Sequence, residues 1–173
     1  MYCILYGDKV VLRPFEKNDL EKNLNWINNS NFQELFLTYL PITKTEEYKW
    51  YEGVIQSKVK IIFSIETKDT GQYIGNIGYS DIDYKNRKAV IWVYIGEKKQ
   101  RRRGYGQESF SMMLDYGVNF LNLRKISLNV AKYNSSAISL YEGSGFLVEG
   151  VFKDDIFIKG KYIDVIRMAK IYI

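Results

Sequence analysis

The sequence contains no histidine, and this absence excludes several classes of chemistry. Serine and cysteine nucleophiles commonly depend on a histidine base, and histidine is a frequent zinc ligand. With none among 173 residues, histidine-dependent triads, histidine bases and histidine-bearing zinc sites are excluded. The single cysteine, Cys3, allows neither an internal disulfide nor a four-cysteine metal site. We therefore expect a site without a metal ion.

Long apolar runs and linkers are also missing. No segment approaches the roughly 20 apolar residues of a membrane span, and the first residues lack the basic stretch and apolar run of a signal peptide. The chain has only two prolines and no glycine- or serine-rich linker. We expect residues 1–173 to form one domain of a cytoplasmic protein, in a reducing environment and without a membrane partner.

The excess of positive charge is confined to one short segment. The formal net charge is +5, from 25 basic and 20 acidic residues. Five of the basic residues lie between Lys98 and Arg103, and outside that window the two signs balance at 20 each. A nucleic-acid-binding protein spreads basic residues over a face in order to neutralise many phosphates. The concentrated charge instead favours a single anionic ligand, and no nucleic-acid partner is expected.

The spacing of apolar residues predicts a mixed domain with about four helices and about seven strands. Helices are predicted at Asn18–Asn28, Thr45–Ser57, Tyr105–Leu121 and about Asn134–Glu142. Eight extended runs are expected to supply these strands, the last two joined as a hairpin: Lys9–Arg13, Lys60–Glu66, Tyr73–Tyr79, Ala89–Ile95, Lys125–Val130, Phe146–Phe152, Asp155–Ile158 and Tyr162–Ile173. The run at Val90–Ile95 is apolar on both faces, which is typical of a central strand.

The basic segment ends in a glycine loop between a predicted strand and a predicted helix. Residues 101–106 read Arg-Arg-Arg-Gly-Tyr-Gly. Glycines allow a sharp turn close to an anion, and the N–H groups and dipole of a helix start favour negative charge. Arginines add charge-assisted hydrogen bonds. Neither the P-loop nor the dinucleotide fingerprint occurs. A different phosphate site is expected, although a solvated basic turn would have the same composition.

Two motifs resemble the GNAT superfamily of N-acetyltransferases. Arg101–Gly106 matches the family's Arg/Gln-x-x-Gly-x-Gly/Ala acetyl-CoA signature, and Asn134–Phe146 resembles its Asn-x-x-Ala-x-x-Leu-Tyr-x-x-x-Gly-Phe segment at the expected spacing. Val11–Pro14 resembles the N-terminal segment, and Gly160–Asp164 the C-terminal hairpin, of a branch of this superfamily that includes ribosomal-protein N-terminal and spermidine acetyltransferases. The resemblance implies an α+β (α/β) GNAT fold, with a mostly antiparallel sheet splayed at its central parallel strand pair.

The resemblance also implies how acetyl-CoA would bind. The loop at residues 101–106 would wrap the pyrophosphate, and its arginines would screen the charge. The pantetheine arm would enter the gap between the central parallel strands, where a main-chain N–H could stabilise the developing oxyanion. The residues implied for this ligand are Tyr94, Ile95, Arg101, Arg102, Arg103, Gly104, Tyr105, Gly106 and Asn134.

One residue of the second motif is implied in catalysis. Tyr141 matches a tyrosine often assigned as the general acid that protonates the departing CoA thiolate, and a phenol with a pKa of about 10 keeps its proton at neutral pH. Packing against the core is the alternative role of Tyr141. Asn134 could contact CoA, cap its helix, or do both. The implied reaction is direct attack of an amine on the thioester through a tetrahedral intermediate.

The general base is left open by the sequence. Many relatives carry a glutamate where Ala89 and Val90 stand here, so that role cannot be transferred. Glu66, Asp81 and Asp83 are the nearest carboxylates by topology, although a solvated charge at a strand end is the simpler interpretation of each. Proton removal through ordered water is equally allowed.

The acceptor amine is open as well. Family analogy suggests a protein N-terminus, a polyamine or an amino sugar, that is, a small-molecule or peptide amine. The two N-terminal helices and their connection, with Phe36, Tyr39 and Leu40, are expected to shape this site. A non-catalytic module that binds acyl-CoA or a partner protein is the alternative function, and a homodimer is suggested by analogy. Acidic residues near these helices favour a polyamine weakly: Asp19, Glu21, Glu34, Glu46, Glu47 and Glu52.

Overall fold

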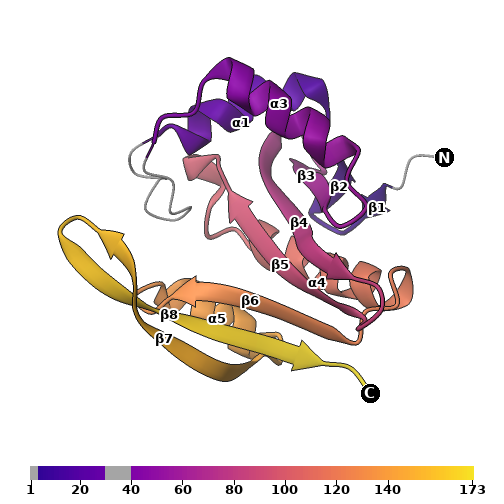
Figure 1. Ribbon diagram of the computed structural model, residues 1–173. Helices are drawn as coiled ribbons and strands as arrows, with labels where there is room; N and C mark the ends of the chain where they lie inside the picture. Colours follow the sequence, from indigo (N-terminus) through magenta and orange to yellow (C-terminus); the bar gives the residue numbers. More distant parts are fainter. Residues whose placement is uncertain (1–3, 30–39) are drawn as a thin grey trace.

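The computed structural model describes residues 4–29 and 40–173, and Figure 1 shows one curved sheet with helices against it. Cys3, Glu34, Phe36 and Tyr39 lie outside the described residues. No helix in the described part is long and apolar enough to cross a membrane. The helical elements are η1 (Lys17–Asp19), α1 (Leu20–Ile27), α3 (Lys44–Ile55), η2 (Lys98–Gln100), α4 (Tyr105–Asn119) and α5 (Ser135–Gly143).

The described residues form a sheet of eight strands in the order β1-β2-β3-β4-β5-β6-β8-β7, and among these pairs only β5–β6 is parallel. This confirms the expected mixed, mostly antiparallel fold. The additional strand is the two-residue β1, which is too short to show an alternating pattern. The strands are β1 (Leu5–Tyr6), β2 (Val10–Pro14), β3 (Ile61–Thr67), β4 (Tyr73–Asp83), β5 (Lys88–Ile95), β6 (Lys125–Ala131), β7 (Leu147–Ile158) and β8 (Lys161–Ile171).

The central parallel pair is splayed, as the resemblance implied. β5 and β6 pair only where Lys88–Val90 lies beside Lys125–Ser127. Beyond these residues β5 keeps its partner β4 and β6 keeps its partner β8, so the sheet opens between β5 and β6 (Figure 1). The remaining edge of each strand therefore faces a gap.

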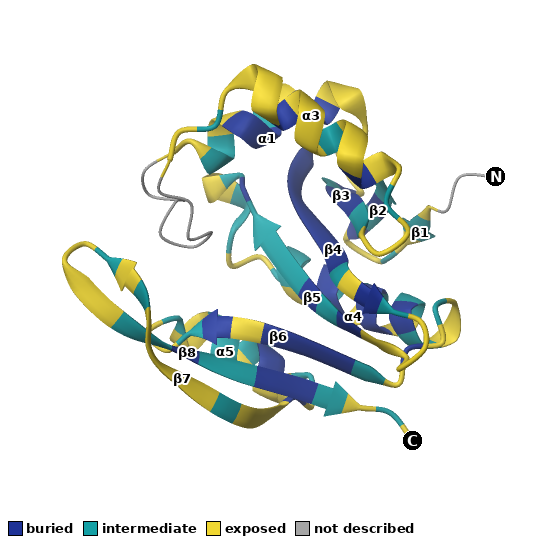
Figure 2. Cartoon of the chain, viewed as in Figure 1, coloured by how far each residue is buried: buried dark blue, intermediate teal, exposed yellow. Residues whose placement is uncertain are grey.

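Helix α4 packs on one face of the sheet, and α1 and α3 pack on the other. Phe110 and Met113 of α4 are fully buried, as the apolar spacing predicted. Figure 2 shows buried residues concentrated in the central strands, whereas the tip of the β7–β8 hairpin is exposed. The Tyr79 hydroxyl on β4 donates to the Met113 carbonyl at 2.8 Å. Gly117 allows this approach, because a Cβ there would lie 2.3 Å from that hydroxyl. Side chains alternate between faces along a strand, so Asn76 of β4 points instead toward α1, where it bonds Asn23.

Two strands run further than the sequence predicts because irregular residues are absorbed into them. β4 continues to Asp83 through a register shift that contains Asp81, whose φ is +51°. The predicted runs Phe146–Phe152 and Asp155–Ile158 form the single strand β7, with a register shift around Asp154, whose φ is also +51°. Such bulges interrupt the two-residue alternation, which makes one strand look like two.

Candidate active site

A cleft of about 1340 Å³ opens along the splay between β5 and β6. Its walls come from α1, α3, the strands β3 to β6, the loop after β5, and α5. Typical small-ligand pockets occupy ~300–1,000 Å³, so this cleft can hold a long ligand together with a second one. The wall that contains the loop and α5 is called the donor half below, and the wall that contains α1, α3 and the β3 to β5 side chains facing them is called the acceptor half.

The glycine loop forms one end of the donor half. Gly104 has a φ of +86° and is the N-cap of α4. Gly104 and Gly106 both line the cleft, as does Arg102, whose φ is +61°. A Cβ on Gly104 would lie 3.2 Å from Nζ of Lys9, which comes from the turn between β1 and β2. The loop thus presents main-chain N–H groups and cationic side chains to the cleft, and sequence reasoning missed the lysine because it lies far away in the chain.

The three arginines of the loop differ in their surroundings. Arg101 Nε donates to the Ile95 carbonyl at 2.9 Å and Nη2 to the Gly96 carbonyl at 3.4 Å. Burial lowers the pKa of Arg101. Arg101 therefore fastens the end of β5 to the loop. Arg103 is exposed and Tyr105 packs against the hydrophobic core, and neither of these two lines the cleft.

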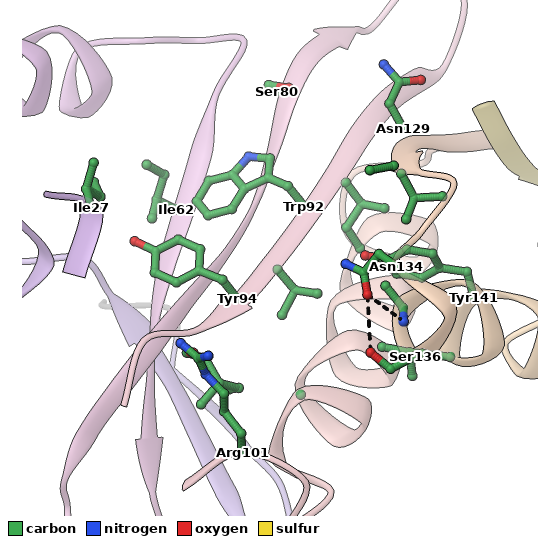
Figure 3. Close-up of a pocket in the computed structure, with 18 of the residues that line it drawn as sticks. Ile27, Ile62, Ser80, Trp92, Tyr94, Arg101, Asn129, Asn134, Ser136 and Tyr141 are labelled. Atoms are coloured by element: carbon green, nitrogen blue, oxygen red, sulfur yellow. Dashed lines mark hydrogen bonds between the residues drawn. The ribbon is translucent and has the colours of Figure 1, made fainter. Parts of the chain in front are cut away.

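The second motif lies beside the loop, on α5 (Figure 3). Asn134 Oδ1 accepts hydrogen bonds from the Ala137 N–H and the Ser136 hydroxyl, each at 3.2 Å, so Asn134 caps the helix while it lines the cleft. Tyr141 is only 9% exposed and packs at 5.2 Å from the Phe110 ring, yet it also lines the cleft. For both residues, the structural role and the position at the cleft coexist.

The hydroxyl of Tyr141 keeps its proton over the whole neutral range. Burial raises its pKa to about 12, from the usual value near 10. A phenol in this state can donate a proton to a departing group, and it carries no negative charge that would repel a phosphorylated ligand.

The three carboxylates considered as bases lie elsewhere and have other partners. Glu66 Oε1 accepts from Arg13 Nε at 2.6 Å. Asp83 accepts from the Asn86 N–H at 2.9 Å, and exposed Asp81 accepts from the Ser80 hydroxyl at 3.3 Å. None of the three is among the residues that line the cleft.

Among the described residues, the carboxylates that line the cleft are Glu46 and Glu47, both on α3. Glu46 is exposed and forms a capping box with Thr43. Glu47 is only 3% exposed, and its Oε1 accepts a hydrogen bond from Asn23 Nδ2 at 2.7 Å. Burial raises the pKa of Glu47, against the opposing effect of that hydrogen bond.

Glu47 is the end of a buried polar network. Asn23 Oδ1 accepts from Asn76 Nδ2 at 2.9 Å and from the Tyr94 hydroxyl. Asn76 Nδ2 also donates to the Tyr94 hydroxyl at 2.6 Å, and Asn76 Oδ1 accepts from the Tyr73 hydroxyl at 2.9 Å. The side chain of Tyr94 therefore belongs to the acceptor half and points away from Tyr141 (Figure 3).

Sequence reasoning missed this network, although one signal was present. Asn23 falls in the apolar stripe formed by Leu20, Leu24 and Ile27, at the spacing that faces the core. An asparagine in such a stripe must find a buried partner. Nothing in the sequence indicates that the partner is Glu47, which looks like an ordinary acidic residue in the first turn of a helix.

Around this network the acceptor half is aromatic and apolar. Trp92 and Tyr94 stack at a centroid distance of 6.0 Å. The indole of Trp92 lies against Gly78, where a Cβ would come within 2.6 Å of it. Trp50 and Ile62 also line this wall. The acceptor half therefore combines apolar surface with one buried carboxylate.

Comparisons with known proteins show the family of the chain. Residues 12–166 match the family described as the acetyltransferase (GNAT) domain. The chain belongs to the GNAT family. It is 33% identical over 164 residues to the spermidine N(1)-acetyltransferase of Vibrio cholerae, and the aligned region covers 94% of this chain and 92% of that protein. This GNAT chain is thus an N-acetyltransferase.

Two solved structures resemble this GNAT enzyme over almost its full length. The spermidine N-acetyltransferase of Vibrio cholerae in complex with CoA and spermine superposes with a TM-score of 0.90 at 30% identity, and covers 95% of this chain and 96% of that one. A dodecameric structure of the same enzyme has a TM-score of 0.83 at 30% identity, covering 95% of each chain. Within the described ranges of this GNAT chain, no three acidic or cysteine side chains are grouped as metal ligands would be.

Proposed function

We propose that this N-acetyltransferase moves the acetyl group of acetyl-CoA to a primary amine of a polyamine such as spermidine, by direct attack. The observation that carries the proposal is the single cleft, in which the glycine loop, the open β5–β6 edge, Tyr141 and the buried carboxylate of Glu47 meet. The similarity to a spermidine acetyltransferase solved with CoA and spermine supports both ligands.

The donor half fits acetyl-CoA. Gly104 and Gly106 leave the main chain accessible at the start of α4, where N–H groups and the helix dipole favour a pyrophosphate. Arg102 and Lys9 supply positive charge beside them. The edge of β5 beyond Val90 has no strand partner on the β6 side, so main-chain groups near Tyr94 and Ile95 can bond the pantetheine arm and the thioester carbonyl.

We assign proton donation to Tyr141. The neutral amine forms the new C–N bond, the C–S bond breaks, and Tyr141 gives its proton to the departing thiolate and recovers one from solvent. General-acid assistance of this kind typically contributes 10²–10⁴-fold to a rate. The proton of the amine leaves through water in the open cleft, which is consistent with the other contacts that engage Glu66, Asp81 and Asp83.

A thiol-release assay tests the reaction and the acceptor together. Purified protein with acetyl-CoA is offered spermidine, N-terminal peptides, amino sugars and amino acids. We expect release of free CoA with spermidine at a higher kcat/KM than with the other amines. Titration calorimetry should show heat with acetyl-CoA and none with duplex DNA of the same concentration. No heat with acetyl-CoA would overturn the assignment of the donor.

We also propose that the chain associates with copies of itself through the β7–β8 hairpin. Large apolar side chains are exposed there, among them Leu147 at 75% and Phe157 at 63%. β7 is an edge strand, and unprotected edges of this kind favour pairing with another chain. The dodecameric relative is consistent with self-association. Sedimentation should give a mass several times 20.4 kDa, and a monomer at micromolar concentration would contradict it.

A further inference from the structure

Glu47 is a buried carboxylate for which the described residues supply no cation. Its one hydrogen-bond donor is the neutral amide of Asn23, and none of the ion pairs within residues 4–29 and 40–173 involves it. An ionised carboxylate away from water is costly unless it is paired. Glu47 nevertheless lines the cleft, so a ligand in the cleft can reach it.

The network behind Glu47 is directed so that it favours the ionised form. Tyr73 donates to Asn76, Asn76 donates to Asn23, and Asn23 donates to Glu47. Asn23 Oδ1 accepts hydrogen bonds from Asn76 Nδ2 and from the Tyr94 hydroxyl. If the Asn23 amide were flipped, its NH2 group would face these donors and its oxygen would face the carboxylate of Glu47. The Nδ2 atom of Asn23 must therefore point at that carboxylate. Chains of aligned hydrogen bonds reinforce one another in a low dielectric. The protein thus holds an acceptor-only group at the wall of the cleft.

The position of Glu47 separates it from the reacting atoms. It lies on α3, whereas Tyr141 lies on α5, across the splay (Figure 1). The hydrogen-bond path from Glu47 to the main chain of β5 runs through the amide of Asn23 and the whole ring of Tyr94. In addition, a carboxylate stabilises the protonated form of an amine that it touches, while the attacking nitrogen must be neutral.

We propose that Glu47 binds a second ammonium group of the acceptor, remote from the nitrogen that is acetylated. The inference rests on the proposed function and narrows it to linear amines that carry at least two amino groups. The methylene chain between these groups would pack on the apolar wall formed by Trp50, Ile62 and Trp92. Glu47 is then a specificity-determining residue: it selects a diamine or polyamine over a monoamine of equal length.

The test compares pentane-1,5-diamine, pentylamine and spermidine as acceptors for wild type, Glu47→Gln and Glu52→Gln. Glu52 is an exposed residue of the same helix that does not line the cleft, so its variant matches the change in charge. In Glu47→Gln we expect KM for the diamine and spermidine to rise about tenfold to a hundredfold, the size of a lost charged hydrogen bond. KM for pentylamine and for acetyl-CoA should change less than about twofold, and Glu52→Gln should behave as wild type.

Other outcomes have distinct meanings. Equal increases in KM for diamine and monoamine would show that Glu47 acts on the reacting nitrogen, and unchanged values would show that it does not touch the acceptor; either result overturns the inference while the acetyltransferase function stands. Calorimetry of diamine binding to wild type and Glu47→Gln gives a readout without turnover. Weaker diamine binding in the variant, with no acetyl transfer by wild type, would retain the inference and reject the proposed function. If wild type neither binds nor acetylates the diamine or spermidine, both the inference and the proposed function fail.

A folding defect is separated by a second variant. Glutamine is isosteric, and its amide oxygen can still accept from Asn23, so Glu47→Gln should remain folded. Glu47→Asp keeps the charge and shortens the side chain. If Glu47 binds the remote cation, we expect Glu47→Asp to retain a preference for pentane-1,5-diamine over pentylamine that Glu47→Gln lacks. Loss of the preference in both variants, with unchanged acetyl-CoA binding and circular dichroism, would contradict the role of charge.

Discussion

The two halves of the cleft are built in different ways. The donor half is formed mainly by two continuous segments, residues 101–106 and residues 134–141, which place two helix starts beside the open edge of β5. The acceptor half joins side chains from α1, α3, β4 and β5, among them Asn23, Glu47 and Asn76. A site formed by the main chain of contiguous residues can be recognised in the sequence as a short motif. A site assembled from side chains that are far apart in the sequence has no such motif.

This difference separates the tasks of the two halves. The proposed donor is the same molecule whatever the acceptor, and its pyrophosphate can be bound by glycines at a helix start. The acceptor half instead depends on which side chains the tertiary fold brings together, so its specificity can change without altering the donor half. Variants on the donor side should therefore affect acetyl-CoA or the chemical step, and variants on the acceptor side should affect the amine or stability.

The largest effect is expected from Gly104→Glu. Gly104 has a φ of +86°, and its added side chain would place bulk and negative charge at the loop, next to Lys9. We expect acetyl-CoA binding to become undetectable by calorimetry, a loss of at least about a hundredfold. Gly71→Glu is the matched control, because Gly71 also has positive φ, at +63°, but lies in open space away from the cleft. Undiminished affinity in Gly104→Glu would reject the loop as the pyrophosphate site.

Tyr141→Phe should come next. The change removes the proton donor and keeps the ring that packs on Phe110. We expect kcat to fall by about a hundredfold or more, with acetyl-CoA affinity within about twofold of wild type. Tyr162→Phe, at an exposed position off the cleft, is the control for loss of a phenol. An unchanged kcat in Tyr141→Phe would remove the acid from the mechanism and leave Tyr141 as a packing residue.

A smaller effect, on stability, is expected from Asn23→Ala in the acceptor half. The change leaves Glu47 without its donor and removes the acceptor of Asn76 and Tyr94. Unsatisfied buried groups cost about 1–3 kcal/mol each, and the free energy of unfolding should fall by about that amount. Asn129→Ala, at an exposed position of the same cleft, should cost less than about 0.5 kcal/mol. Urea denaturation measures both, and equal costs would argue against a buried network.

The smallest effect concerns the pH dependence of stability at Glu47. Its pKa is raised in the folded state by burial, so the unfolded chain releases this proton at lower pH than the folded chain. Wild type therefore loses stability as pH rises from about 4.3, the ordinary value for glutamate, through the raised pKa. Glu47→Gln lacks this loss, so its Tm relative to that of wild type should be higher at pH 7 than near pH 4. A lower relative Tm at pH 7 would contradict the raised pKa.

Much of the fold was predictable because it follows local rules. The apolar stripe on α4 predicted the buried residues Phe110 and Met113, and the helix predicted at Thr45–Ser57 agrees with α3 (Lys44–Ile55) to within two residues at either end. The predictions failed where a strand absorbs irregular residues, as at Asp81 and Asp154, because positive-φ residues look like turns in the sequence. The two-residue strand β1 was not predicted, because its pairing with β2 depends on the neighbouring strand rather than on a pattern in its own two residues.

The candidate site divides in the same manner. The loop, Asn134 and Tyr141 were predicted as site residues from sequence motifs, and all three line one cleft in the structure. The sequence did not predict that Arg103 and Tyr105 lie away from the cleft, since neighbouring residues in a loop point in different directions. Glu66 looked available as a base, but it pairs with Arg13, which also binds Asp19 through two hydrogen bonds of 2.6 and 2.7 Å.

The sequence by itself determined the family, the order of the elements and the two segments proposed to bind the donor, because a glycine loop at a helix start and a helix with a buried stripe are properties of contiguous residues. It also concentrated the excess charge in the segment that forms the glycine loop. Only the tertiary structure decided which carboxylate faces the cleft. That choice required α1, α3, β4 and β5 to meet, so that Asn23 could direct its amide at Glu47 and the carboxylate could lie buried at the wall of the cleft.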